Sequence, residues 1–187
     1  MRNPHWFRKT VFPEIANNDH IMEFGAGFGD IANDLVSYAP CQPTHYRAID
    51  LSPPPADFPT QFAWQQIDCM SIKDFGTTSV FFGNLIIHQF DNIQLKTLGQ
   101  RINESQIRLI ALQEPERCKR SEWLFKFLYP IVNDVSRHDG NVSIRAGFKN
   151  DELAQIFGLN ESWRYTVETS FFGSYRFLAT RDAPSPS

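Results

Sequence analysis

Short apolar segments alternate with longer amphipathic segments along this chain. Apolar runs bounded by glycine, proline or asparagine are typical of strands, whereas apolar residues three and four positions apart predict helices. On this pattern, strands are expected at residues 20–24, 46–50, 62–67, 79–82 and 106–112. Because helical segments separate strands of this kind, the pattern predicts a parallel sheet with helical crossovers.

The remaining segments complete this picture. Helices are expected at residues 30–37, 92–103, 122–132 and 150–158. The last of them begins with a capping residue and ends at a glycine. Residues 163–169 and 171–180 alternate apolar and polar positions around Gly173, which predicts an antiparallel hairpin at one edge of the sheet. The expected fold is therefore α/β and Rossmann-like: a doubly wound, mostly parallel, seven-stranded sheet with a C-terminal antiparallel hairpin.

The chain length fits one domain. It has 187 residues, within the range of about 100–200 that is typical of a single domain. We expect this domain to span residues 1–182, with a short N-terminal segment around His5, Trp6 and Phe7 acting as a substrate lid. Residues 183–187 are expected to be a disordered tail, because they have nothing to bury.

Charge and cysteine usage narrow the possible partners. The chain has 18 Lys and Arg against 21 Asp and Glu and no basic run, so nucleic acid is not an expected partner. Neither a membrane span nor a secretory signal is expected from the apolar stretches, so we expect a cytoplasmic protein. Cys41, Cys69 and Cys118 are odd in number and widely spaced, which predicts reduced thiols and no metal site.

Aromatic residues are abundant, with 17 Phe, 4 Trp and 5 Tyr. Most are expected in the core, but so many in one small domain leave some to line an apolar ligand pocket. Residues 123–129 are candidates for that lining, with ordinary core packing as the alternative.

One octet carries most of the chemistry. It follows the first strand and reads Glu23-Phe24-Gly25-Ala26-Gly27-Phe28-Gly29-Asp30. Alternate glycines place small residues where the backbone turns tightly and a ligand approaches closely. The third glycine of a dinucleotide fingerprint is replaced by Asp30, whose carboxylate would repel a pyrophosphate. The loop instead suits a ligand with a cationic end and no phosphate, a description that the ammonium and sulfonium of S-adenosylmethionine fit.

This octet resembles motif I of the class I S-adenosylmethionine-dependent methyltransferases. Residues 27–32 are similar to the G-T-G-D-L-A form common among the small-molecule members. The resemblance implies S-adenosylmethionine as the cofactor. It also implies that the cofactor is held by the acid and the loop, namely Glu23, Gly25, Ala26, Gly27 and Gly29.

Two further acids end the next two strands. Asp50 lies about 20 residues after the glycine loop, where a doubly wound fold places a carboxylate that accepts the ribose hydroxyls. Asp68 matches the family position whose carboxylate binds the adenine amino group. The resemblance also implies contacts to the adenine from the Cys69 amide and from Leu51, Ile67 and Met70. A solvated loop residue is the alternative for each acid.

Two later segments also resemble family elements. Residues 83–90 are similar to the segment often written L-H-H-F, and not to the N-P-P-Y signature of amino-group methylation; they add Asn84 to the cofactor site. Residues 137–148 resemble the R-H-D-G-x-x-S-V-R-R-A-F element of a branch found with polyketide and phenolic-lipid pathways, although Ala146-Gly147 departs from it. His88 and His138 are the candidate catalytic bases, with a structural histidine as the alternative for each.

The leading hypothesis is S-adenosylmethionine-dependent methyl transfer to a hydroxyl or an activated carbon of a small, largely apolar metabolite. One alternative is a non-catalytic Rossmann-like partner subunit that binds the cofactor. The other is an NAD(P)-dependent oxidoreductase. The sequence leaves open the acceptor, the methylated atom and the oligomeric state.

Overall fold

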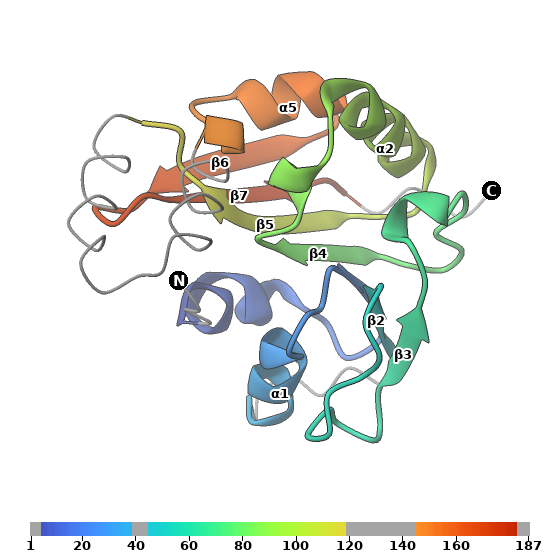
Figure 1. Cartoon of the computed structure of the whole chain (residues 1–187). Coiled ribbons are helices and arrows are strands. Elements are labelled where there is room, and N and C mark those ends of the chain that lie inside the picture. The colour runs from blue at the N-terminus through green and yellow to red at the C-terminus, as the bar shows by residue number, and fades with distance from the viewer. Residues whose placement is uncertain (1–4, 39–44, 119–144, 183–187) are drawn as a thin grey trace.

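One seven-stranded sheet forms the centre of the molecule. The computed structural model describes residues 5–38, 45–118 and 145–182. The strands of this described part are β1 (His20–Phe24), β2 (His45–Asp50), β3 (Ala63–Gln66), β4 (Val80–Asn84), β5 (Leu109–Pro115), β6 (Arg164–Thr169) and β7 (Ser174–Thr180). Their order is β3-β2-β1-β4-β5-β7-β6 (Figure 1). Strands β1 to β5 are parallel, and β7 is antiparallel to both β5 and β6, which confirms the predicted fold.

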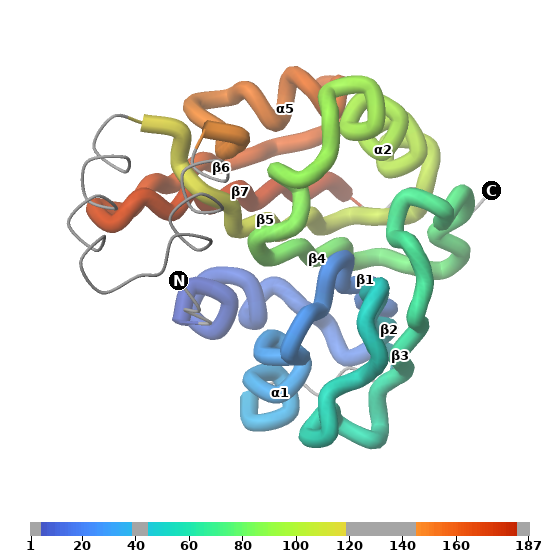
Figure 2. The backbone as a smooth tube through the Cα atoms, in the orientation of Figure 1, coloured from blue at the N-terminus to red at the C-terminus, as the bar shows by residue number. Residues whose placement is uncertain are grey.

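Helical segments cover both faces of the sheet (Figure 2). The π-helical turn η1 (Phe7–Val11), the 3-10 turn η2 (Phe12–Glu14) and helix α1 (Asp30–Val36) lie on one face. Helices α2 (Asn92–Glu104) and α5 (Glu152–Phe157) pack together on the other. The 3-10 turns η3 (Cys69–Ser71) and η4 (Ile87–Gln89) follow β3 and β4. The sheet is therefore the middle of three layers.

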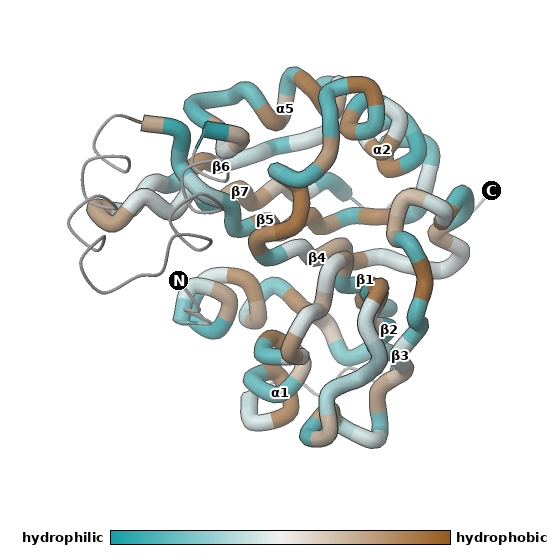
Figure 3. Tube along the Cα trace, viewed as in Figure 1, coloured by the Kyte–Doolittle hydropathy of each residue, from teal (hydrophilic) through white to brown (hydrophobic). Residues whose placement is uncertain are grey.

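The hydrophobic core is divided by the sheet into two clusters. The cluster under α2 and α5 includes Met22, Phe24 and Phe81, and the cluster under α1 and η1 includes Ile21 and Phe82. Neighbouring strand residues thus face opposite clusters, as strand geometry requires. Figure 3 shows the corresponding pattern in α1 and α2, where hydrophobic and hydrophilic residues recur at intervals along each helix.

The N-terminal segment belongs to the second cluster. Trp6 and Phe7 are buried there, and the Phe7 ring lies 5.5 Å from that of Phe82, centroid to centroid. These two side chains therefore cover the sheet. The function of this segment as a substrate lid stays a prediction.

The carboxyl end of β5 differs from the sequence expectation. We expected the strand at residues 106–112, but it runs from Leu109 to Pro115. Its pairing with β7 continues to Pro115, opposite Ser174, and this pairing keeps Gln113 and Glu114 inside the sheet with exposed fractions of 2% and 1%. The hydropathy pattern ended the strand too early because two of its buried side chains are polar.

Two local expectations are also corrected. Helical crossovers were expected between the parallel strands, but residues 51–62 between β2 and β3 contain no helix, and the connection from β3 to β4 contains only the short η3. The proline run after Asp50 explains the first case, because prolines cannot continue a helix. Helix α5 ends at Gly158 in the left-handed conformation, as expected, but its first turn has no side-chain cap.

Several expectations concern residues outside the described ranges. These are the helix at 122–132, the aromatic residues at 123–129, Cys41, His138 and the tail 183–187. Within the described ranges, no helix combines the length and the apolar character that crossing a membrane requires.

Candidate functional site

A cleft of about 480 Å³ opens at the carboxyl ends of the parallel strands. It lies beside the neighbouring strands β1 and β4. The chain adds β2 and β3 on one side of β1 and then crosses to the other side to form β4 and β5, so the strand order reverses here. Open α/β sheets bind ligands at this kind of switch point. Most of the predicted cofactor residues line the cleft: Glu23, Gly25, Ala26, Gly27, Asp50, Leu51, Asp68, Cys69 and Asn84.

The cleft is acidic. Four carboxylate residues line it, namely Glu23, Asp30, Asp50 and Asp68. Among the described residues that line it, none is Lys, Arg or His. The field inside the cleft therefore attracts cations and repels phosphates.

The glycine loop adopts a backbone that its glycines permit. Gly25, Gly27 and Gly29 have φ angles of 63°, 56° and 70°, in the left-handed region. A Cβ atom on Gly25 would lie 2.5 Å from a side-chain carbon of Ile86, so the loop also packs too closely for a larger residue there. The amides of Gly25 and Ala26 donate to the carbonyl of Ile49 (2.8 and 3.2 Å), which ties the loop to the end of β2.

Asp50 joins the glycine loop to the loop after β2. Its Oδ2 accepts a hydrogen bond from the Gly27 amide (2.8 Å), and its Oδ1 accepts one from the Ser52 amide (2.8 Å). Each carboxylate oxygen has a second acceptor site, so Asp50 can still accept hydroxyl protons from a ligand. The sequence predicted a ligand contact and missed this bond to the glycine loop.

Glu23 is the buried acid of the cleft, with an exposed fraction of 1%. Its Oε2 accepts a hydrogen bond of 2.5 Å from the Tyr46 hydroxyl. Burial raises the pKa of Glu23 to about 8, and the nearby Asp30 and Asp50 act in the same direction, while the Tyr46 bond opposes them. Burial and the Glu23 carboxylate likewise raise the pKa of Tyr46. A cation in the cleft would favour the ionised form of Glu23.

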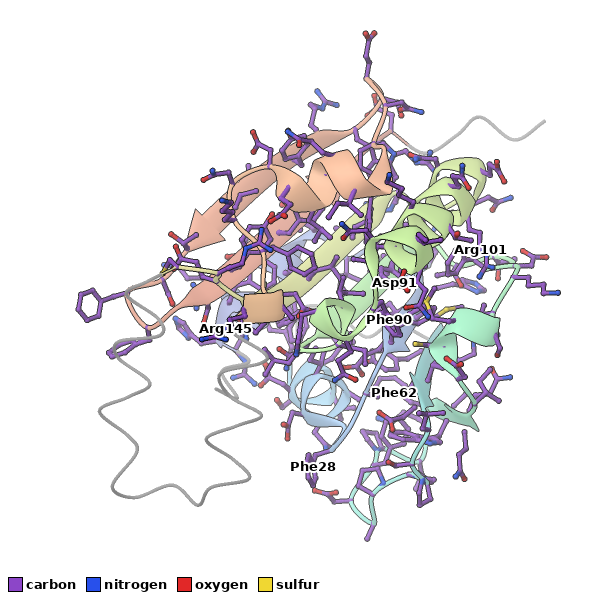
Figure 4. The ribbon with its side chains drawn as sticks, turned by 45° about the horizontal axis from the view of Figure 1, so that its top comes forward. Phe28, Phe62, Phe90, Asp91, Arg101 and Arg145 are labelled. Atoms are coloured by element: carbon purple, nitrogen blue, oxygen red, sulfur yellow. The ribbon has the colours of Figure 1, made fainter. Side chains whose placement is uncertain are left out.

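Asp68 organises the loop after β3. Its Oδ1 accepts from the Met70 amide at 2.9 Å and caps η3. From the other side, Arg101 of α2 donates to the carbonyls of Met70 and Ile72 at 3.2 and 2.8 Å (Figure 4). Burial raises the pKa of Cys69 to about 11, so its thiol stays protonated at neutral pH.

Two predicted cofactor residues, Met70 and Gly29, are not among the described residues that line the cleft. Met70 packs against the first core cluster, and the Gly29 amide donates to the Ala26 carbonyl within the loop (2.8 Å). Their contact with a cofactor stays a prediction. Of the proposed adenine contacts, Ile67 lines the cleft, and Leu51 lines it with 72% of its surface exposed.

A buried pair, Glu114 and His88, lies at the turn after β4. The sequence analysis named His88 but not Glu114. The side chain of Glu114, at the end of β5, is completely buried, and its Oε1 accepts from the amides of Ile86 (3.1 Å) and Ile87 (2.8 Å). Its Oε2 lies 2.6 Å from Nδ1 of His88, whose side chain is 8% exposed. Leu85, which begins the turn, has a φ of 59°, a strained value for a residue with a side chain.

The position of His88 differs from that of the cofactor residues. His88 is not among the described residues that line the cleft, although its neighbours Ile86, Gln89 and Phe90 are. Figure 4 shows Phe90 and Asp91 at the start of α2, next to this turn. Glu114 could have been found by the rule that identified Asp50 and Asp68, because it too is an acid at the carboxyl end of a parallel strand.

The structure resembles solved methyltransferase structures. No family model and no curated protein sequence matches the chain. The plantazolicin methyltransferase BpumL, in complex with a triazolic desmethylPZN analog and SAH, has a TM-score of 0.71 and 12% identity over 94% of this chain and 81% of that chain.

Two further structures match over a smaller share of their own length. Human N-acetylserotonin methyltransferase in complex with SAM has a TM-score of 0.59 and 12% identity, over 95% of this chain and 52% of that one. The small RNA methyltransferase HEN1 has a TM-score of 0.69 and 11% identity, over 98% of this chain and 25% of that one. At these identities the likeness establishes the fold: this chain has the Rossmann-like fold of these methyltransferases.

Proposed function

We propose that this protein is a methyltransferase that uses S-adenosylmethionine. The observation that carries the proposal is the acidic cleft at the switch point, with a glycine loop and three predicted acids around one cavity. The proposal is supported by the neighbours with this fold whose structures hold SAH or SAM. The sequence resemblance to motif I, found independently of the structure, supports the same cofactor.

The chemistry of the cleft fits this cofactor better than it fits NAD(P). S-adenosylmethionine has a sulfonium, an ammonium and a ribose but no phosphate, and the cleft offers carboxylates, with no cationic side chain among the described residues that line it. Glu23 would face the cationic end, Asp50 would accept the ribose hydroxyls, and Asp68 with the Cys69 amide would hold the adenine. A pyrophosphate would meet Asp30 at the start of α1, which disfavours the oxidoreductase alternative.

The bound cofactor supplies an electrophilic methyl group on a sulfonium. The protein then has to align an acceptor with that methyl group and keep water away. The hydrogen bonds of Asp50 to the Gly27 and Ser52 amides keep the loops around the cleft in one arrangement before the ligand arrives. Such preorganisation reduces the entropic cost of binding.

His88 is the proposed general base for the acceptor. A carboxylate only accepts hydrogen bonds, so Nδ1 of His88 is the donor in a pair with the Glu114 carboxylate. The other ring nitrogen, Nε2, is then the atom that would take a proton from the acceptor. The arrangement of a base held by a buried carboxylate is typical of proton abstraction from a hydroxyl or an activated carbon. Because His138 lies outside the described residues, it remains the second candidate.

The acceptor is proposed to be a small, largely apolar metabolite. The neighbours are named for plantazolicin, N-acetylserotonin and small RNA, so the fold alone does not select an acceptor. At the edge where the cleft opens, several exposed side chains are large and apolar: Phe28, Leu51, Phe171 and Phe172. The last two lie in the turn between β6 and β7, beside the carboxyl end of β5. The element at 137–148 supports an acceptor of the polyketide or phenolic-lipid kind.

An acceptor screen tests this function. The protein is incubated with cofactor labelled in the methyl group and with phenols, quinone precursors or polyketide-like acids, and with tRNA and a protein extract as controls. Label transferred to one class of small molecule supports the proposal. Label found only in RNA or protein would refute the acceptor. Binding of the cofactor with no turnover on any acceptor would favour the alternative of a non-catalytic partner subunit.

A further inference from the structure

A second hollow lies at the opposite edge of the sheet, at the amino ends of β1 and β2. Its volume is about 370 Å³. Imidazole, guanidinium, amide and hydroxyl groups line it, from His20, His45, Arg47, Gln61, Thr77 and Thr78. No carboxylate is among the described residues that line it, although the chain as a whole has a net charge of −3. This hollow and the acidic cleft therefore have opposite electrostatic character.

Two histidines stand side by side in this hollow. His20 and His45 begin β1 and β2 and are paired across the sheet. Their rings are stacked, with centroids 4.0 Å apart and an angle of 27° between the planes. Nδ1 of His20 lies 2.9 Å from the Thr77 hydroxyl oxygen. Arg47 lies two residues after His45 and so on the same face of the strand. The fold thus gathers two imidazoles and one guanidinium around one hollow.

The carboxylates nearest in the sequence are engaged with other groups. Asp19, which precedes His20, accepts hydrogen bonds from Arg108 and from the Ser79 hydroxyl. Asp74 accepts one from the Gly76 amide (2.8 Å).

The stacked rings of His20 and His45 are close enough for their charges to interact. If both imidazoles were protonated, they would repel each other, because like charges disfavour the charged form. An anion beside both rings would reverse that preference.

We propose that this hollow is a binding site for a phosphate-class dianion, either free phosphate or the phosphate group of a small monoester. The two imidazole rings and the Arg47 guanidinium offer N–H donors to several oxygens of such an anion at once. Charge-assisted hydrogen bonds from such groups are the strong ones in proteins. The site lies at the opposite edge from the acidic cleft, so its ligand is neither the methyl donor nor the acceptor.

The test follows the imidazole C–H resonances of the whole protein by NMR during titration with inorganic phosphate. Sodium chloride holds the ionic strength constant, and acetate and glycerol phosphate are titrated in parallel. We expect saturable shifts of two histidine resonances with phosphate and weaker shifts with acetate. Tighter binding of glycerol phosphate than of phosphate would identify the monoester as the ligand, and the reverse order would identify the free ion.

Variants complete the experiment. His45→Gln and Arg47→Gln are each expected to weaken phosphate binding about tenfold or more, because each removes a charge-assisted contact. Arg164→Gln is the matched control, since Arg164 is an exposed arginine on β6 at the far edge of the same sheet. Wild-type resonances that show no saturable shift would overturn the proposal. Acetate binding as tightly as phosphate, or unchanged binding in both variants, would also overturn it.

Discussion

At the carboxyl edge of the sheet, the sequence predicted the residues of the loops after β1, β2 and β3 better than those of the turn after β4. On the cofactor side, the loops after β1, β2 and β3 place their predicted acids, Glu23, Asp50 and Asp68, around one cleft. On the side where we propose that the acceptor binds, the turn after β4 is held by Glu114, which the sequence did not single out. A glycine loop leaves a motif in the sequence, whereas a buried carboxylate such as Glu114 leaves only an acid at a strand end, and its partners in the turn after β4 are remote in the sequence.

The largest expected effect concerns the acceptor side. Replacing the base in His88→Ala should lower kcat about 10²–10⁴-fold while the affinity for the cofactor hardly changes. Arg164→Ala, at an exposed arginine of β6, is the control and should leave kcat unchanged. Steady-state kinetics with the acceptor found in the screen, together with calorimetry of cofactor binding, would measure both quantities. A kcat equal to that of the wild type would show that His88 is structural.

The next effect concerns the cofactor side. Asp50→Ala removes charge-assisted hydrogen bonds to the ribose and the link to the Gly27 amide. We expect a loss of about 1.5–3 kcal/mol, or roughly ten- to a hundredfold in affinity for S-adenosylhomocysteine. Asp57→Ala, an exposed acid in the connection between β2 and β3, is the matched control. If calorimetry gives the same affinity for both variants, Asp50 does not contact the cofactor.

A smaller effect, spread over pH, tests Glu23. Because the pKa of this carboxyl in the free protein is about 8, it is mostly protonated at neutral pH, and a bound cation favours its ionisation. Affinity for S-adenosylmethionine should therefore rise with pH, by at most about tenfold per unit below pH 8, and level off above it. Calorimetry between pH 6 and 9 would measure the slope. Glu23→Gln should remove the component that is due to this group, and an unaltered slope would contradict this account.

The same group makes a prediction about the free protein. Its pKa is raised on folding, so between about pH 5 and pH 8 the folded state holds a proton that the unfolded state has lost. The free energy of unfolding should therefore fall as pH rises through this range. Urea unfolding of wild type and Glu23→Gln would show the difference, because the glutamine has no proton to lose.

The smallest expected effect concerns the N-terminal cap of α2, which stabilises the fold and does not line the cleft. Asp91 caps α2 by accepting from the amides of Ile93 and Gln94, both at 2.8 Å, and Gln94 completes the capping box with a bond to the Asp91 amide. Asp91→Ala should lower the free energy of unfolding by about 1 kcal/mol. Since Asp91 does not line the cleft, its cofactor affinity should stay that of the wild type. A loss of affinity would place the start of α2 in the site.

The fold was largely accessible from the sequence, and its errors have physical causes. The parallel strands and the hairpin were found because alternation and apolar runs follow directly from burial. The end of β5 was missed because Gln113 and Glu114 are polar yet buried, and only their partners on β4 and the turn after it justify that burial. Such partners are remote in the sequence, so no local pattern reveals them.

In the candidate site, too, some positions follow from the sequence pattern and others depend on partners that are remote in the sequence. Residues whose position follows from a strand end, such as Asp50 and Asn84, were predicted and do line the cleft. Met70, which the resemblance places at the adenine, is not among the described residues that line the cleft, and its contact with the cofactor stays a prediction. The side on which a short turn places each residue depends on its hydrogen bonds, here those of Asp68 and Arg101, which the sequence does not display.

Calorimetry of the purified protein with S-adenosylhomocysteine and with NAD, each titrated separately, tests the central claim most directly. The acidic cleft predicts saturable binding of S-adenosylhomocysteine with one site per chain and no heat of binding with NAD. Binding of NAD with no response to S-adenosylhomocysteine would contradict the claim.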